Sequence, residues 1–225
     1  MPVAAVVFDL YGTLLAIDSM QTHVAAAGAR DPGAFVADWR RKQLEYAFLT
    51  SMAGEYRDFD ELTAQALAFT CAQRNVPLNS SRQRALAEAW RTMPAHGDVA
   101  LVLQALAAQK IPLAVLTNGT PASANTALEH AGVRALLTDV LSVDSVRAYK
   151  PDPRVYALAT ARFACAPREI VFVSSNAWDA WGAASFGFRV AWCNRAGNAA
   201  ETLSPLPETT LAGLHELPAF VARAG

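Results

Sequence analysis

The chain has 225 residues, and 53% of them are hydrophobic, which is enough for one sizeable core or a core with a small inserted domain. Its formal net charge of -1 excludes the strongly basic character of a nucleic-acid-binding protein and favours a small-molecule substrate. No apolar run reaches the roughly 18 residues that cross a bilayer, so we expect no membrane partner.

The opening segment MPVAAVVF lacks a basic leader and a small-residue cleavage site, so it is expected to be a strand and not a signal peptide. The three cysteines are odd in number and far apart, without the spacing of a zinc site or a disulfide framework. They are Cys71, Cys165 and Cys193. This pattern indicates a reducing compartment, and a cytoplasmic protein is expected.

Short apolar runs without polar alternation predict buried parallel strands. Four such runs lie at 3–8, 111–116, 169–174 and 188–193, and a weaker fifth lies at 138–143. Helical patterns occur between or after them at 99–109, 123–132, 153–164 and 178–187. The alternation of strand and helix from about Gly97 onward predicts an α/β fold with a doubly wound, mainly parallel, Rossmann-like sheet.

Between the first strand and Pro94 this alternation stops. Three stretches there have helical spacing and no strand candidate: 34–52, 60–75 and 80–93. Asp58 or Asp60 is a plausible N-cap of the second stretch, and Ser80 or Ser81 of the third. The sequence therefore predicts an α/β core domain, residues 1–14 and 96–225, with an inserted helical cap domain, residues 15–95. The tail after Gly197 has no feature that we can assign to function.

Polar residues follow four of the predicted strands, where ligands bind in open α/β sheets. They are Asp9 with Thr13, the segment 117–120, Lys150, and the segment 174–179. Taken singly, each has an ordinary structural explanation: a turn, a helix N-cap, an exposed loop lysine, or a carboxylate at a helix N-terminus. Their convergence on one sheet edge favours a catalytic site.

The segments FDLYGTL, LTNG, YKPDPRVY and VSSNAWDAWGA resemble, in this order, the four motifs of the haloacid dehalogenase superfamily, and the resemblance covers nearly the whole chain. DLYGTL, WRRKQLEY and SSNAWD are similar in particular to the (S)-2-haloacid dehalogenases of type II. In the many phosphatases of the superfamily, a second aspartate two residues after the first protonates the departing alkoxide. This chain has Tyr11 there. Because halide is a good leaving group and needs no acid, Tyr11 favours halide displacement.

The same residues indicate whether the chain could bind a metal ion. A magnesium site for phosphoryl transfer needs carboxylate ligands from the first and last motifs. Tyr11 offers none, and Ser174, Ser175 and Asn176 precede Asp179. We therefore expect neither a metal nor another cofactor.

The expected reaction begins with attack of the Asp9 carboxylate on C2 of a short 2-haloalkanoate, opposite the halogen, giving an aspartyl ester with inversion. Water then hydrolyses the ester to an (R)-2-hydroxy acid. Lys150 and an arginine would offset the repulsion between the two anions. The resemblance assigns the arginine to Arg40, where it helps to cradle the halide. Arg41 stays open as an alternative, because neighbouring side chains on a helix point about 100° apart.

The resemblance also implies the remaining contacts with the substrate. Thr117 and backbone amides near Tyr11 would hold the substrate carboxylate, and Asn118 with Trp178 would lie beside the halide. The apolar wall of the pocket would consist of Tyr11, Leu44, Phe59 and Trp178, although such residues often belong to a core.

For the second step, Asp179 is the candidate to position and deprotonate water. Asn176 and Ser174 would hold the ester, with Lys150 stabilising charge. Tyr156 would either donate a hydrogen bond within this network or simply pack against it. Thr13 is expected to orient Asp9.

Two alternatives stay open at this point: a magnesium-dependent phosphatase of the same superfamily, and a non-catalytic binding protein. Burying Asp9, Lys150 and Asp179 together would cost a scaffold protein several kcal/mol, which argues against the second. None of the four histidines lies in a motif, so a Ser-His-Asp hydrolase has no support. By resemblance, a homodimer formed through the cap is expected.

Overall fold

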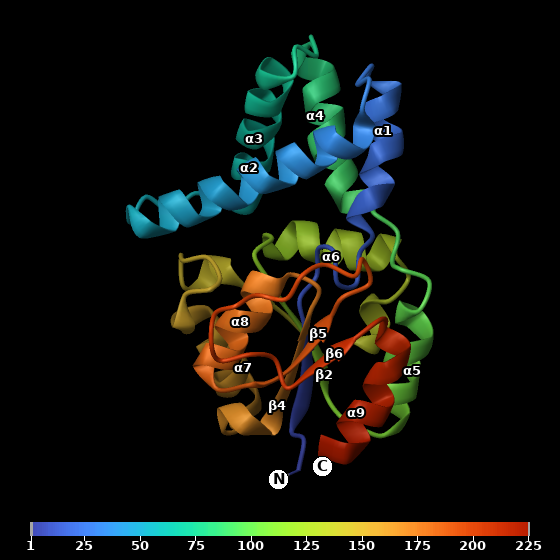
Figure 1. The fold of residues 1–225 in the computed structure, drawn as a ribbon, viewed down its shortest axis with the longest axis vertical. Coiled ribbons are helices and arrows are strands. Elements are labelled where there is room, and N and C mark those ends of the chain that lie inside the picture. The colour runs from blue at the N-terminus through green and yellow to red at the C-terminus, as the bar shows by residue number, and fades with distance from the viewer. Residues whose placement is uncertain (1, 225) are drawn as a thin grey trace.

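Six parallel strands form the central sheet of the computed structural model, which describes residues 2–224 (Figure 1). Their order is β3-β2-β1-β4-β5-β6, and every neighbouring pair is parallel. Strand β1 therefore has β2 on one side and β4 on the other, so the strand order reverses there. The strands are β1 (Ala5–Phe8), β2 (Leu113–Thr117), β3 (Asp139–Ser142), β4 (Ile170–Ser174), β5 (Arg189–Cys193) and β6 (Thr209–Leu211).

The five predicted strands and the parallel α/β fold are confirmed, with strand ends that differ by one or two residues. Strands β1, β2 and β4 are buried along their whole length, because helices cover both faces of the sheet. Strand β6 was not predicted. It has three residues and an exposed middle threonine, Thr210, so it lacks the apolar run by which the others were recognised.

Helices α7 and α8 lie on one side of the sheet, and α5 and α9 lie on the other (Figure 1). The helices of this part are α5 (Val99–Ala108), α6 (Pro121–His130), α7 (Pro153–Phe163), α8 (Ala177–Phe186) and α9 (Leu217–Ala224). Two of these helices begin at residues that strongly favour a helix N-terminus. Thr120 caps α6 and Asp152 caps α7, and each is followed by a proline at the first helical position.

The other four helices gather beyond the carboxyl ends of the strands, and α6 lies between them and the sheet (Figure 1). They are α1 (Met20–Ala26), α2 (Pro32–Met52), α3 (Phe59–Gln73) and α4 (Ser80–Glu88), and a 3-10 turn follows at Ala89–Thr92. The segment that leads from the sheet to α1 and the segment that returns from α4 to α5 run side by side. The Ala16 amide donates to the Pro94 carbonyl, and the His96 amide donates to the Leu14 carbonyl. The division into a core and a cap domain stays a prediction.

The N-caps of this group differ in part from expectation. Asp58 caps α3, as one of the two alternatives predicted. The expected caps Ser80 and Ser81 are wrong, because Asn79 caps α4 by accepting a hydrogen bond from the Arg82 amide at 2.9 Å. Asparagine caps as well as serine, so it sets the helix start one residue earlier.

Within residues 2–224, none of the helices combines the length and the apolar character that crossing a lipid bilayer requires.

Candidate active site

Asp9 directly follows β1, at the position where the strand order reverses. Its side chain is only 9% exposed, and both carboxylate oxygens accept hydrogen bonds. Oδ1 accepts from Lys150 Nζ at 3.0 Å. Oδ2 accepts from Thr13 Oγ1 and from Asn176 Nδ2, each at 2.9 Å. The carboxylate is therefore held in one orientation by groups from three separate segments.

Lys150 connects Asp9 to a second carboxylate. Its ammonium donates to Asp179 Oδ2 at 2.9 Å, and Tyr156 donates its hydroxyl to Asp179 Oδ1 at 2.8 Å. Burial lowers the pKa of Lys150, but Asp179 and Asp9 outweigh it, so the pKa is raised and the ammonium stays charged. Burial raises the pKa of Asp179, and this effect exceeds the opposing effects of Lys150 and Tyr156.

Tyr156 both packs and donates a hydrogen bond, so the two possibilities left open by the sequence are combined. Its ring contacts Phe172, Phe186 and Phe188, while its hydroxyl contacts Asp179. The rings fix the direction from which the hydroxyl approaches the carboxylate.

Thr13 links the first loop to the segment after β4. Its hydroxyl donates to Asp9 and accepts from the Ser175 amide at 2.8 Å. Ser174 lies deeper, where its hydroxyl accepts from the Asn176 amide at 3.1 Å. The structure therefore brings Thr13 and Asn176 onto Asp9, whereas Ser174 contacts the backbone of Asn176 and not the Asp9 side chain.

Thr117 and Asn118 lie at the end of β2, and both are buried. Asn118 Oδ1 accepts from the Lys150 amide at 3.2 Å and so supports the loop that carries the lysine. Thr117 Oγ1 accepts from the Gly119 amide at 2.9 Å, and within residues 2–224 its own hydroxyl donates to no protein acceptor. That hydroxyl can therefore donate to a bound carboxylate.

Tyr11 is buried between the first loop and the helices above the sheet. Its ring centroid lies 6.1 Å from that of Phe59 and 5.7 Å from that of Trp90. Burial, with Asp60 nearby, raises the pKa of Tyr11, so the phenol stays neutral. A Cβ atom at Gly119 would lie 2.9 Å from the Tyr11 ring, so only glycine permits this close approach.

The four residues expected in the apolar wall do not form one aromatic cluster. Tyr11 and Phe59 are in contact, as expected. Trp178 instead packs edge to face on Phe48 of α2, at a centroid distance of 5.3 Å. Leu44 is half-buried on α2, four residues before Phe48.

Arg40 and Arg41 point in different directions. Arg40 Nη1 donates to Gln43 Oε1 at 2.6 Å, and its guanidinium carbon lies 5.9 Å from the ring centroids of both Phe59 and Trp90. Burial lowers the pKa of Arg40, with Asp9 opposing this effect. Arg41 has a side chain that is 57% exposed and pairs with Asp38. Of the two arginines, it is Arg40 that faces the site.

Three residues in contact with this site were not predicted: Gln43, Ser175 and Trp90. Gln43 is fully buried, accepts from Arg40 and donates to Thr63. It lies three positions after Arg40, and a polar residue on the inward face of a predicted helix is a signal that could have identified it. Trp90 carries no such signal. Its indole nitrogen is the one buried side-chain polar atom without a hydrogen-bond partner among residues 2–224.

The site combines an oriented carboxylate, a cation and a second carboxylate, all of them buried. Two carboxylates around an ammonium can deliver attack on an electrophilic carbon and then activate water. In the described part of the chain, no group of three or more His, Cys, Asp and Glu side chains is arranged to hold a metal ion.

Comparisons with known proteins identify the family of the chain. The family model described as haloacid dehalogenase-like hydrolase matches residues 3–187. The (S)-2-haloacid dehalogenase of Pseudomonas sp. (strain YL) is 38% identical over 226 residues, covering 99% of this chain and 97% of the relative. (S)-2-haloacid dehalogenase 2 of Pseudomonas sp. (strain CBS-3) is 37% identical over 216 residues, covering 96% of this chain and 94% of the relative.

A solved structure extends the likeness to the fold. It is L-2-haloacid dehalogenase from Xanthobacter autotrophicus with chloropropionic acid covalently bound, and it superposes with a TM-score of 0.93 at 31% identity over 98% of each chain. With matches of this length in both sequence and structure, the chain belongs to the haloacid dehalogenase-like hydrolases, in the group of the (S)-2-haloacid dehalogenases.

Proposed function

We propose that this protein hydrolyses short (S)-2-haloalkanoates to (R)-2-hydroxy acids through an ester on Asp9, without a metal. The observation that carries the proposal is the Asp9 carboxylate, held on both oxygens beside Lys150, with Tyr11 where a phosphatase would have its acid. The covalent chloropropionic acid in the Xanthobacter relative supports a covalent step.

In the first step, one oxygen of Asp9 forms a bond to C2 as the carbon–halogen bond breaks, and the electron pair leaves with the halide. The substrate brings a carboxylate close to Asp9, and two anions in a desolvated site repel each other. Lys150, in contact with Asp9, and Arg40, which faces the site from α2, supply the compensating charge. Thr117 has a hydroxyl available for the substrate carboxylate.

In the second step, water attacks the carbonyl carbon of the Asp9 ester and the acyl–oxygen bond breaks. The product hydroxyl then carries an oxygen that came from Asp9, and the water oxygen remains in the regenerated carboxylate. Asp179 accepts one proton from the water and returns it to the departing alkoxide oxygen, which gives the product hydroxyl, and the second water proton is released when the Asp9 carboxyl ionises again. Both oxygens of Asp179 already accept one hydrogen bond, but an ionised carboxylate has about four acceptor sites, so it keeps acceptor capacity for a water.

The phosphatase alternative is disfavoured. The two curated relatives named above, at 37% and 38% identity, are dehalogenases, and a neutral, buried Tyr11 cannot replace a carboxylic acid as proton donor to an alkoxide because its pKa is raised.

Chloride release from the separate enantiomers of 2-chloropropionate, in buffer containing a chelator, tests the proposal. Release from the (S) form alone, with (R)-lactate as product, is expected. Turnover that needs added magnesium, or cleavage of a phosphate monoester in its place, would overturn the proposal. The Asp9→Asn variant, checked by mass spectrometry for deamidation, should release no chloride.

A single turnover in water enriched in oxygen-18 separates the ester route from direct attack of water on C2. The ester route predicts the label in Asp9 and unlabelled lactate. Labelled lactate in the first turnover would show that water attacks the substrate itself.

Two further expectations from the sequence belong to this proposal. We expect a homodimer formed through α1–α4, and light scattering can measure the molar mass. A monomer at micromolar concentration would contradict this expectation. A cytoplasmic location agrees with the three cysteines, none of which forms a disulfide in the described residues, and cell fractionation would test it.

A further inference from the structure

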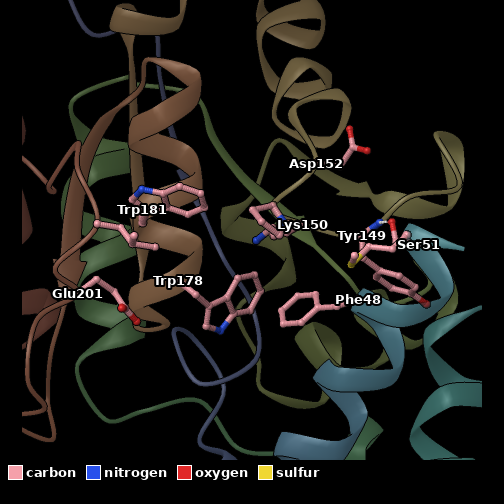
Figure 2. Close-up of a pocket in the computed structure, with 11 residues that line it drawn as sticks. Phe48, Ser51, Tyr149, Lys150, Asp152, Trp178, Trp181 and Glu201 are labelled. Atoms are coloured by element: carbon pink, nitrogen blue, oxygen red, sulfur yellow. Dashed lines mark hydrogen bonds between the residues drawn. The ribbon is translucent and has the colours of Figure 1, made fainter.

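A cavity of about 550 Å³ lies beside the catalytic residues, between α2, α8 and the segment after β5. Figure 2 shows Trp178 and Phe48 near Lys150, with Trp181 and Glu201 on one side and Tyr149 and Ser51 on the other. Met52 and Leu203 complete much of the apolar lining. Apart from Lys150 and Trp178, these residues have no role in the proposed reaction.

The cavity adjoins the catalytic site at Lys150. That residue lines the cavity, and its ammonium contacts Asp9 and Asp179. Trp178 lines the cavity and directly precedes Asp179. A ligand in the cavity would therefore lie next to the groups that act on C2.

One face of helix α2 extends from the catalytic site to the cavity. Residues four positions apart on a helix lie on the same side, so Arg40, Leu44 and Phe48 form a row. Arg40 faces the catalytic site, and Phe48 reaches the cavity. The charge at one end of this row suits an anion, and the aromatic ring at the other suits an apolar group.

The chemistry of the cavity fits an apolar group and not a second anion. Most of its wall is aromatic or aliphatic, and the acidic residues Asp152 and Glu201 also line it. Their charge disfavours a carboxylate there. A volume of about 550 Å³ lies within the usual range for small-molecule sites and far exceeds what the methyl group of a 2-halopropionate needs.

We propose that this cavity is a subsite for the alkyl or aryl substituent on C2 of longer 2-haloacids, while carboxylate and halogen stay at the catalytic site. The inference rests on the proposed function and extends it to a substrate class. Such substrates are 2-haloacids with a medium-length alkyl chain or an aromatic ring.

The test compares kcat/KM for (S)-2-bromooctanoate and (S)-2-bromopropionate. The unmodified enzyme should turn over both. Leu203→Asp places a charge in the apolar lining and should lower kcat/KM for the octanoate about tenfold or more, because an apolar chain loses its apolar contact there. The propionate value should stay within about twofold of the unmodified enzyme, because this substrate does not reach the cavity.

Leu206→Asp is the matched control. Leu203 and Leu206 lie in the same segment and are 54% and 60% exposed, but only Leu203 lines the cavity. Leu206→Asp should leave both substrates unchanged. Halogen-free octanoate should inhibit propionate turnover competitively, and more weakly in the Leu203→Asp variant.

Several results would overturn this inference. An unmodified enzyme that acts on the propionate and not on the octanoate would overturn it and leave the proposed function intact. Equal effects of Leu203→Asp and Leu206→Asp would also overturn it. So would a Leu203→Asp variant that becomes monomeric with both activities unchanged, because the cavity would then hold a second copy of the chain. Failure on both substrates would overturn the proposed function as well.

Discussion

The ammonium of Lys150 lies 3.0 Å from Oδ1 of Asp9, and both side chains are almost completely buried. The same ammonium lies 2.9 Å from Asp179. One cation thus serves two carboxylates that would otherwise repel each other in a medium of low dielectric constant. This arrangement places the Lys150 ammonium between the proposed nucleophile and the proposed base.

Lys150→Met should abolish turnover and lower the free energy of unfolding at pH 7 by about 3–5 kcal/mol, because two buried carboxylates lose their partner. Protonation of either carboxyl then relieves the repulsion. Because the folded variant gains protons more readily than its unfolded chain, its stability should rise as pH falls from 7 to 5. Urea unfolding at the two pH values measures this, and a variant equally stable at both would contradict the explanation.

Arg40→Ala and Arg41→Ala form a matched pair on α2. Arg40 faces the site between two aromatic rings, whereas Arg41 is exposed and pairs with Asp38. Arg40→Ala should lower kcat/KM for 2-chloropropionate at least about a hundredfold, since charge compensation is lost for both substrate and leaving halide. Arg41→Ala should stay within about twofold. Steady-state kinetics of the two variants tests this prediction. A larger loss of kcat/KM in Arg41→Ala than in Arg40→Ala would assign the charge compensation to Arg41.

Tyr156→Phe should move the acid limb of the kcat profile to higher pH. The Tyr156 hydroxyl donates to Asp179 and lowers the pKa of that carboxyl, so its removal raises a pKa that burial already holds above the usual range. Asp179 must be ionised to accept a proton from water. We expect the midpoint of this limb to move to higher pH, measured where ester hydrolysis limits the rate. A lower kcat with an unchanged midpoint would mean that Tyr156 only packs.

Gly182→Ala should disturb the same hydrogen bond from α8. A Cβ atom at this position would lie 2.5 Å from the Tyr156 hydroxyl and 2.6 Å from Cβ of Pro151. The overpacking should cost about 1–3 kcal/mol of stability and reduce kcat. Gly97→Ala is the control, because a Cβ atom there meets no neighbour within 4 Å. Thermal unfolding of both variants tests this, and equal melting temperatures would contradict it.

The strands and the sheet-edge position of Asp9, Lys150 and Asp179 could be predicted from the sequence. Buried parallel strands appear as short apolar runs, and functional residues follow them directly, so local pattern and topology give the same result. Strand β6 lacked that pattern, since it depends on pairing with β5 and not on its own apolar residues.

The details of the site depend on contacts that no local pattern contains. Whether Arg40 or Arg41 faces inward is a matter of helix rotation, which packing of α2 on α3 decides. The cavity joins Phe48, Trp181 and Leu203, which are far apart along the chain. The sequence by itself determined the fold class and the proposed reacting groups, because these follow from residue type and order. Only the tertiary structure decided which side chains surround them, because that depends on how separate elements pack.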